Sequence, residues 1–463
     1  MQFARTWQRN GVAPVVPDFL KGEIPPLIRQ LAIPVSVGMF FNTMYNVVDT
    51  WYAGLLSTSG IAALTLSFPV FFAVFSAGHG LSTATTAIVS GELGKSDENS
   101  AARFFAQSLG FSVVLSLVLT VVGMMFLRPI LMVMSGDSAV VDIAQTYLQV
   151  LFFGVPFLIV VGTVNSALTA RGDTRAYRNV LIAGFFLNLG FNPLFMFGVS
   201  WLGIPAMGIS GIALATALIQ VVGLIYLLRR AIFRGCFAHV HLHHFRPRWD
   251  ILKIVVGQAF PAALGMLLVS VGIFIINSFV SRSGNTHAVA AYGVAMRIEQ
   301  IALLPTIGLG IAMLTITGQN SGAGQFERIR HTFRTALFYG GIVMVVMLSV
   351  IVPFAPFWIS LFDDTPAVVA IGTRYLRIEM ITFFAYFVLF LSISMLQGLK
   401  RPLPAVWIGL YRQVLAPLAL FSLFIFGLDL PVVSIWWGIC GISWSAAVVV
   451  WLYGRWLLTR MSA

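Results

Sequence analysis

Charged side chains are scarce in this sequence. Asp, Glu, Lys and Arg together make up 10% of its 463 residues, whereas a soluble globular domain has roughly 25%. A soluble protein needs a charged surface around its core, so this shortage excludes a soluble globular chain. Hydrophobic residues account for 59% of the sequence, and we therefore expect a polytopic membrane protein.

Cysteine and catalytic motifs are also lacking. The two cysteines, Cys236 and Cys440, are too few for a disulfide framework. No G-x-x-x-x-G-K-[ST], H-E-x-x-H, C-x-x-C or nucleophile-elbow sequence occurs. We therefore expect neither an enzyme nor a bound cofactor. The formal net charge of +12 does not indicate a nucleic-acid partner, because membrane proteins gather Lys and Arg in their cytoplasmic loops.

Twelve apolar segments are long enough to cross a bilayer, which takes about 20 helical residues. The fold class we expect is all-α and polytopic, with twelve transmembrane helices in two six-helix bundles. The segments cover roughly residues 28–56, 61–90, 104–127, 143–169, 179–199, 209–229, 254–281, 288–317, 335–355, 371–397, 404–427 and 433–456.

The basic residues are distributed unevenly between the two sides of the membrane. If the chain starts inside, the inner loops and the two tails hold 22 of the 28 Lys and Arg residues. Only Arg128 and Arg282 clearly fall in outer connections. This asymmetry predicts that both termini are cytoplasmic. Residues 1–27 are then a cytoplasmic tail or a surface helix.

A long polar connection, residues 230–253, lies at the middle of the chain. We interpret it as a cytoplasmic linker between two halves. Its histidines invite a metal-site interpretation, but their spacing is compact and no Cys or acid completes a ligand pattern. A solvated linker or a membrane-surface helix is the expected structure. The histidines in question are His239, His241, His243 and His244.

The two halves repeat each other. The sequence LAIPVSVGM, which contains Pro34, aligns with QAFPAALGM, which contains Pro261, 227 positions later. Six spans separate the copies, so both have the same topology, and the bundles are related by an axis along the membrane normal. Such a pair encloses a central cleft that opens to either side. The predicted lobes are residues 28–229 and 254–463.

One carboxylate stands out within the first span. Asp49 lies in a hydrophobic segment, where a charge costs roughly 3 kcal/mol or more. Its counterpart in the repeat is Ile276, so the acid is not part of the shared scaffold. We therefore treat Asp49 as a functional candidate that belongs to the first lobe alone.

Other polar side chains in the first lobe could join Asp49. Asn188 and Asn192 are four residues apart and share one helix face. A carboxylate with amide and hydroxyl oxygens suits a hard cation such as Na⁺, and Asp49, Asn188 and Thr216 could then be its ligands. Burial disfavours a charged carboxyl group, so Asp49 alone could instead take up H⁺. The asparagines could also simply join helices by hydrogen bonds. The candidate cation-coupling set is Asp49, Asn165, Asn188, Asn192 and Thr216.

Further candidates are spread over both lobes. Pro34 precedes Asp49 by about 22 Å along a helix and permits a bend, although the repeat favours a scaffold role for it. In the second lobe, Glu299 forms either a buried ion pair with Arg412, or a second coupling or cationic-substrate site. His79 is an intramembrane histidine that could carry protons.

Near the start of the tenth span, Glu379 and Arg377 are expected to form an interfacial ion pair.

Several motifs together resemble the multidrug and toxic compound extrusion (MATE) transporters of prokaryotes. They are VVDTWYAG, GELGKSDENSA, ALTARGDTR, LNLGFNPLFMFG, MGISGIALATALIQ and AYGVAMRIEQIALLP. The resemblance covers nearly the whole chain. It implies twelve helices in two lobes and the export of amphipathic, often cationic, compounds in exchange for H⁺ or Na⁺ by alternating access. We expect a monomer in the bacterial cytoplasmic (inner) membrane, whose partners are small molecules and lipid.

The resemblance also assigns roles to residues. It places ion coupling on Asp49, the cation cluster on Asn165, Asn188 and Thr216, and the helix kink on Pro34. Some members have a second aspartate where this chain has Asn192, which argues against a relay of two aspartates. A flippase for a lipid-linked saccharide, or an exporter of a specific metabolite, is the alternative function.

Overall fold

The structure, a computed structural model, describes residues 18–56, 58–200, 203–282 and 286–462. Eleven helices in these ranges are long and apolar enough to cross a membrane, and a bent helix pair brings the number to twelve. Extended pairing within the described chain is limited to one bridge, between Val199 and Ile204. The all-α class and the span count are therefore confirmed. The predicted tail, residues 1–27, lies mostly outside the described residues.

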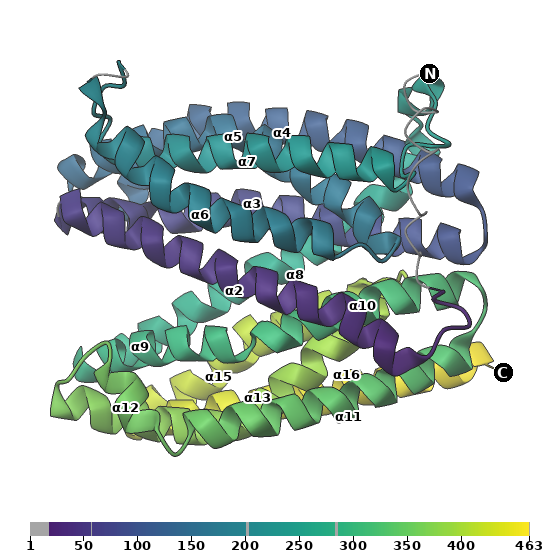
Figure 1. Cartoon of the computed structure of the whole chain (residues 1–463). Helices are drawn as coiled ribbons and strands as arrows, with labels where there is room; N and C mark the ends of the chain where they lie inside the picture. Colours follow the sequence, from purple (N-terminus) through teal and green to yellow (C-terminus); the bar gives the residue numbers. More distant parts are fainter. Residues whose placement is uncertain (1–17, 57, 201–202, 283–285, 463) are drawn as a thin grey trace.

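The first lobe consists of long helices joined by short connections (Figure 1). They are α2 (Ile24–Leu56), α3 (Thr58–Gly94), α4 (Glu98–Met134), α5 (Ser138–Ala170), α6 (Arg175–Phe197) and α7 (Ile209–Phe233). The linker that follows contains one short 3₁₀ turn, η2 (Leu242–Phe245).

The second lobe is more broken. It contains α8 (Trp249–Arg282), α9 (Thr286–Ala302), α10 (Leu304–Gly322), α11 (Phe326–Ile351), α12 (Ala355–Ser360), α13 (Pro366–Gly398), α14 (Leu403–Leu410), α15 (Ala416–Ser422) and α16 (Val433–Ser462). Two π-helical turns, η3 (Tyr411–Leu415) and η4 (Leu423–Gly427), interrupt the span that starts with α14.

The eighth predicted span is bent. Helices α9 and α10 meet at an angle of 44° around Leu303. Pro305 stands in the first turn of α10, where its missing N–H does not disturb the new helix but cannot continue the preceding one. The proline therefore accounts for a break that a count of apolar residues did not predict.

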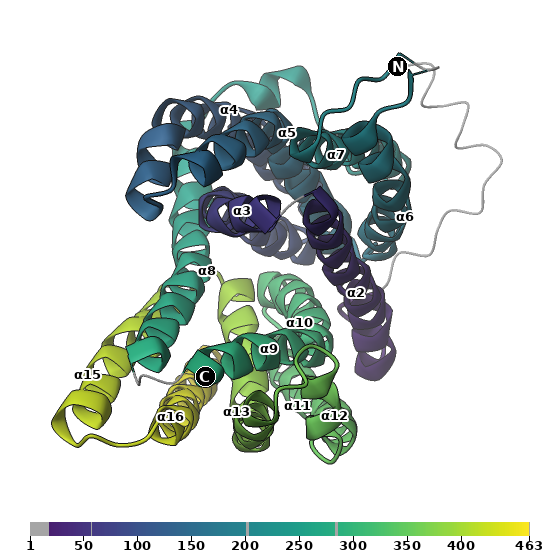
Figure 2. The same ribbon diagram turned by 90° about the vertical axis from the view of Figure 1, so that its left-hand side faces the viewer.

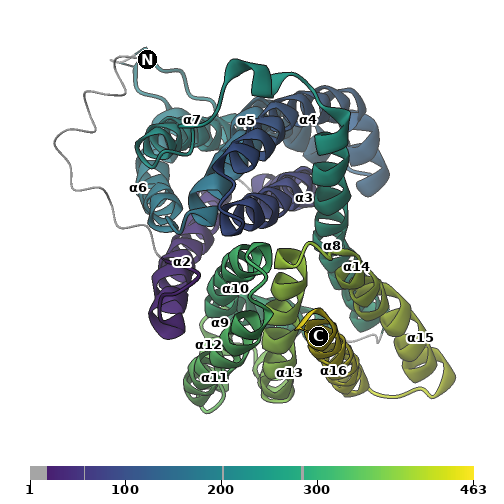
Figure 3. The same ribbon diagram turned by 90° about the vertical axis from the view of Figure 1, so that its right-hand side faces the viewer.

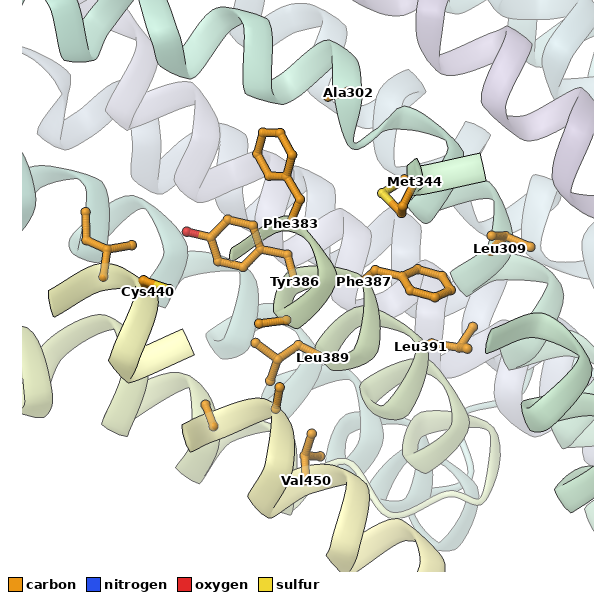
Figure 4. Packing of buried hydrophobic residues seen from close by; sticks show 14 of the residues in the cluster. Ala302, Leu309, Met344, Phe383, Tyr386, Phe387, Leu389, Leu391, Cys440 and Val450 are labelled. Atoms are coloured by element: carbon orange, nitrogen blue, oxygen red, sulfur yellow. The ribbon is translucent and has the colours of Figure 1, made fainter. Parts of the chain in front are cut away.

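The core of the second lobe surrounds α13. Figure 4 shows Phe383 and Phe387 of this helix among side chains from neighbouring helices, including Met344 of α11 and Leu309 of α10. All four side chains are buried. Fully burying such a side chain contributes about 1.5–3 kcal/mol relative to leaving it exposed, so this cluster holds the lobe together.

The first helix of each lobe packs partly on the other lobe. In the views along the helices, α2 and α8 run between the two groups of helices on opposite sides (Figure 2, Figure 3). The beginning of α2 belongs to the hydrophobic core of the second lobe, and the beginning of α8 belongs to that of the first. The exchange follows the internal repeat, because equivalent residues of α2 and α8 are buried in the core of the opposite lobe. These equivalent pairs, each 227 residues apart, are Ile24 and Ile251, Ile28 and Val255, and Ala32 and Ala259.

Two glycines make this exchange possible. A Cβ on Gly80 of α3 would lie 2.5 Å from the carbonyl oxygen of Ala259, and a Cβ on Gly308 of α10 would lie 2.5 Å from that of Ala32. Neither position has room for a side chain. Small residues that let helix backbones touch are typical of membrane helix contacts, so these glycines fix where the lobes meet.

The lobes also touch at the end of the molecule that carries the linker, which we call the linker end. Gly318 of α10 packs against Ser90 of α3, where an added Cβ would lie 2.7 Å from the Ser90 Cβ. The amide of Gln319 donates to the carbonyl oxygen of Ala170 at 2.7 Å. We call the opposite end, where α2 finishes and α3 begins, the far end.

Candidate functional site

Asp49 lies in the half of α2 that packs within the first lobe, and 8% of its surface is exposed. Its Oδ1 accepts two hydrogen bonds from α6, from Asn188 Nδ2 at 2.7 Å and from Asn192 Nδ2 at 2.8 Å. Both asparagines are fully buried. The structure therefore brings together three of the five residues that the sequence proposed for cation coupling.

The two asparagines also contact each other. Asn192 Nδ2 donates to Asn188 Oδ1 at 3.2 Å, as expected for amides four residues apart on one helix face. Asn192 Oδ1 is buried without a hydrogen-bond partner among the described residues. A buried acceptor without a donor costs about 1–3 kcal/mol, so this oxygen is available to a ligand that can donate or coordinate.

Thr216 joins the cluster through a tyrosine that the sequence analysis missed. Tyr45 donates from its hydroxyl to Thr216 Oγ1 at 2.8 Å, and it interacts electrostatically with Asp49. The spacing of four residues between Tyr45 and Asp49 puts both on one face of α2 and could have revealed it. Tyr147 of α5 also interacts with Asp49, but no local sequence pattern links these two.

Asn165 is not brought to Asp49. Its side chain is half-buried, and Thr169 Oγ1 contacts its Oδ1 at 3.5 Å. Asp49 lies about 10 Å from the far end of α2, whereas Asn165 lies about 40 Å along α5 from that same end. Asn188, Asn192, Thr216 and Tyr147 are within ten residues of the far end of their helices. Depth in the membrane therefore separates Asn165 from the cluster.

Pro34 lies inside α2, which continues as one helix on both sides of it. The proline stands close to the point where α2 passes from the second lobe to the first. The side chain of His79 on α3 is exposed, with its ring 6.2 Å from that of Phe75. Neither residue contacts Asp49 through a hydrogen bond among the described residues.

A second buried polar cluster lies in the second lobe. Glu299 Oε2 accepts from the hydroxyl of Tyr375 at 3.1 Å. The guanidinium of Arg412 lies over the ring of Tyr386, 4.5 Å from its centre. The described chain contains no ion pair between Glu299 and Arg412, so the predicted direct pair is wrong. The two groups still interact electrostatically. Arg412 is carried by the π-helical turn η3, a type of irregularity that is frequent at functional sites.

The predicted interfacial ion pair between Glu379 and Arg377 is also wrong. It is fully buried, whereas Arg377 is exposed, because residues two apart on a helix do not share a face. Both carboxyl oxygens of Glu379 lack a hydrogen-bond partner in the described chain, and the group interacts electrostatically with Glu299 and Arg412. Glu379 therefore does not form the predicted interfacial ion pair with Arg377. It is a buried acid that interacts with a second buried acid, Glu299.

A comparison with protein families identifies the fold. The model of the MatE family matches this chain twice, over residues 34–194 and 261–420. The two matches begin 227 residues apart, which is the offset of the internal repeat. The chain belongs to the MatE family. MatE proteins are transporters, so the chain is a multi-pass membrane transporter.

Curated MatE relatives cover nearly the whole chain. It is 26% identical to "Probable multidrug resistance protein YpnP" of Bacillus subtilis, over 96% of this chain and 98% of the relative. It is 25% identical to the "FAD transporter" of Shewanella oneidensis, over 91% and 94% of the two chains.

Solved MatE structures share the fold. The structure described as "Outward-facing conformation of a multidrug resistance MATE family transporter of the MOP superfamily" superposes with a TM-score of 0.89 at 24% identity. The superposition covers 96% of this chain and 98% of that one.

Proposed function

We propose that this transporter is a secondary active multidrug exporter, which exchanges amphipathic cationic compounds for H⁺ or Na⁺ and is coupled through Asp49. The observation that carries the proposal is the buried carboxylate of Asp49, held by Asn188 and Asn192 on a helix that reaches both lobes. A single charge in that position can respond to a cation. The helix that bears it can pass the response to the second lobe.

The oxygen atoms around Asp49 suit either ion. A proton would neutralise the carboxylate and weaken its two charge-assisted hydrogen bonds to α6. Na⁺ would instead need several oxygen ligands, and Asp49 with the unpartnered Asn192 Oδ1 could begin such a set. The described residues contain no group of three His, Cys, Asp or Glu side chains arranged to hold a metal ion.

The coupling step follows from the path of α2. Its far-end half carries Asp49 against α6, whereas its linker-end half packs in the core of the second lobe. Neutralising Asp49 loosens the contact with α6, and a change in the tilt or bend of α2 near Pro34 then shifts the second lobe. We expect substrate release and ion uptake to alternate through this movement.

The proposed setting is the bacterial cytoplasmic (inner) membrane. Both termini and the linker are proposed to be cytoplasmic, and the basic residues at the linker end support this orientation. We propose a monomer as the working unit, because both lobes and the contacts between them belong to one chain.

The decisive experiment is drug efflux from proteoliposomes under an imposed pH gradient alone or an imposed Na⁺ gradient alone. Wild type should transport under at least one gradient, and Asp49→Asn should lose that transport while remaining inserted. Asp142→Asn is the matched control, because the side chain of Asp142 is 59% exposed and pairs with Arg128, which is not a hydrogen-bond partner of Asp49. Wild-type efflux by Asp49→Asn would refute coupling through this residue.

An exporter of a specific anionic metabolite is the second candidate, and the relative named as an FAD transporter favours it. The two functions differ in substrate charge. Excess FAD should leave the efflux of a cationic dye unchanged if the first proposal holds. Competition by FAD together with ion-driven FAD transport would favour the second.

A further inference from the structure

A cavity lies at the linker end, between the first turns of α4 and the linker that crosses above α4 and α5 in Figure 3. Its volume is about 250 Å³, somewhat below the roughly 300–1,000 Å³ of pockets for drug-sized molecules. A small polar group fits it better than a drug does. Its basic lining residues are Arg103, His241, His243, His244 and Arg248.

Gln107 of α4 holds the linker in place over this cavity. The side chain of Gln107 is buried, with 3% of its surface exposed. Its Nε2 donates to the carbonyl oxygens of His244 and Arg246, and its Oε1 accepts from the backbone N–H of Arg248 at 3.1 Å. Three hydrogen bonds from one buried amide fix the basic residues of the linker relative to α4, so the cavity is preformed.

The three imidazoles pack against one another. The rings of His241 and His243 are stacked, with centres 5.4 Å apart, and the centres of the His243 and His244 rings are 4.2 Å apart. The backbone N–H of His241 donates to Nδ1 of His244 at 3.3 Å. In the neutral ring, Nε2 of His244 therefore carries the proton and is a donor.

The positive charge at the cavity is only partly balanced. Arg248 bonds to Asp250 at 2.7 Å, and Nε of Arg103 donates to the carbonyl oxygen of Asn99 at 3.4 Å. No ion pair in the described chain engages Arg103. Desolvation, together with the charges of His243, His241 and Arg103, lowers the pKa of His244, as expected where basic groups outnumber the neighbouring acids Asp97 and Asp250.

From this arrangement we propose that the cavity binds a negatively charged phosphate group. Arg103 supplies a guanidinium, whose fork of N–H donors matches phosphate oxygens, and the imidazoles supply further donors. An anionic phospholipid is the favoured carrier, because 89% of the Leu242 surface and 75% of the Trp249 surface are exposed beside the cavity. Trp is enriched where a protein meets the membrane–water interface, and clusters of basic residues immediately next to the cytoplasmic ends of transmembrane helices bind anionic lipid headgroups.

The test uses the full-length protein, purified in a neutral detergent and stripped of lipid. Phosphatidylglycerol is titrated against phosphatidylcholine in one arm, and inorganic phosphate against chloride at equal ionic strength in the other. Bound lipid is counted by native mass spectrometry, and the shift in melting temperature is measured in both arms. Arg103→Gln and His243→Gln should weaken binding in the responding arm, Arg103→Gln by roughly tenfold, the loss expected for one charge-assisted contact.

The control variants are Arg246→Gln and His239→Gln, which remove the same side-chain types from the linker outside the cavity lining. A response to phosphatidylglycerol identifies a lipid headgroup, and a response to inorganic phosphate alone identifies a soluble phosphate. Equal losses in the cavity and control variants, or no response of wild type in either arm, would overturn the proposal. Asp49→Asn should keep the wild-type response, which separates this site from ion coupling.

Discussion

Glu92 and Lys400 form an ion pair between the two lobes, with Lys400 Nζ 3.0 Å from Glu92 Oε1. Glu92 is near the end of α3, and Lys400 follows α13. The same carboxylate also pairs with Lys95 of its own lobe at 3.0 Å. The side chain of Glu92 is 9% exposed, so this contact at the linker end is shielded from solvent more than an ordinary surface pair.

Lys400→Met should weaken the closure of the linker end. Spin labels on Val133→Cys and Phe357→Cys, two exposed positions at the far end, should report a larger population of shorter distances. In the proposed alternating-access movement, opening of the linker end brings the lobes together at the far end. Both native cysteines are buried, which limits background labelling. Lys95→Met removes the other partner of Glu92 and leaves the lobes joined, so its distances should remain those of wild type. An unchanged distribution in Lys400→Met would show that the glycine contacts alone close this end.

Tyr45→Phe should reduce ion-driven efflux without unfolding the protein. The change removes the hydrogen bond to Thr216, a net contribution of about 1 kcal/mol, and loosens the side of the site that faces α7. The apparent affinity for the driving ion should fall roughly fivefold. Tyr226→Phe is the control, because its hydroxyl bonds to exposed Asn179 and not to the Asp49 cluster. Equal effects of the two variants would argue against a role for Tyr45 in the site.

Glu379→Gln should leave the protein at least as stable as wild type. The carboxyl group of Glu379 is buried and interacts unfavourably with Glu299, and neither of its oxygens has a hydrogen bond of good geometry in the described chain. A buried polar group without such a bond destabilises a fold. We expect a gain of about 1 kcal/mol in thermal unfolding in detergent. The efflux assay then shows whether this acid takes part in transport. Marked destabilisation would mean that the wild-type carboxylate has a partner within the folded protein.

His244 should titrate below its ordinary value of 6.5, because desolvation and the neighbouring His243, His241 and Arg103 disfavour its protonated form. The unfolded chain then binds the proton more readily, so this group destabilises the fold as the pH falls through about 6.5 and below. Histidine NMR resonances followed over pH measure the pKa directly, and bound phosphate should raise it. The charged or titratable groups near His244 are Arg103, His241, His243 and Arg248. Two acids act on these groups, because Asp97 interacts with Arg103 and Asp250 pairs with Arg248.

The spans could be predicted from the sequence because burial in lipid demands a continuous run of apolar residues. Every predicted span corresponds to a helix or a bent pair, and most helices extend beyond it, as α3 does past Glu92. At the membrane–water interface, a helix can either continue through polar residues or end at them. The composition therefore locates a span better than its ends.

The sites were harder to predict than the spans. Asn188 and Asn192 could be proposed as partners of Asp49 from the sequence. Their spacing of four residues puts both amides on one helix face, and the repeat assigns Asp49 to the same lobe. Asn165 and Glu379 show the limit. Depth along α5 and rotation about α13 decide what these residues contact, and neither quantity can be read from residue type. Tyr45 was within reach, because helical spacing alone relates it to Asp49.

The exchange of half-helices between the lobes gives this single chain the organisation of a domain-swapped dimer. Each half of the sequence, cut at the linker, would contain one helix that begins in the wrong lobe. Ile24 and Ile28 could find their packing partners only after the second half had been made and inserted. Either half expressed alone would present an unmatched apolar stripe, and the two halves expressed together should reassemble. The fold of the first lobe is in this sense completed by the last half of the chain to be synthesised.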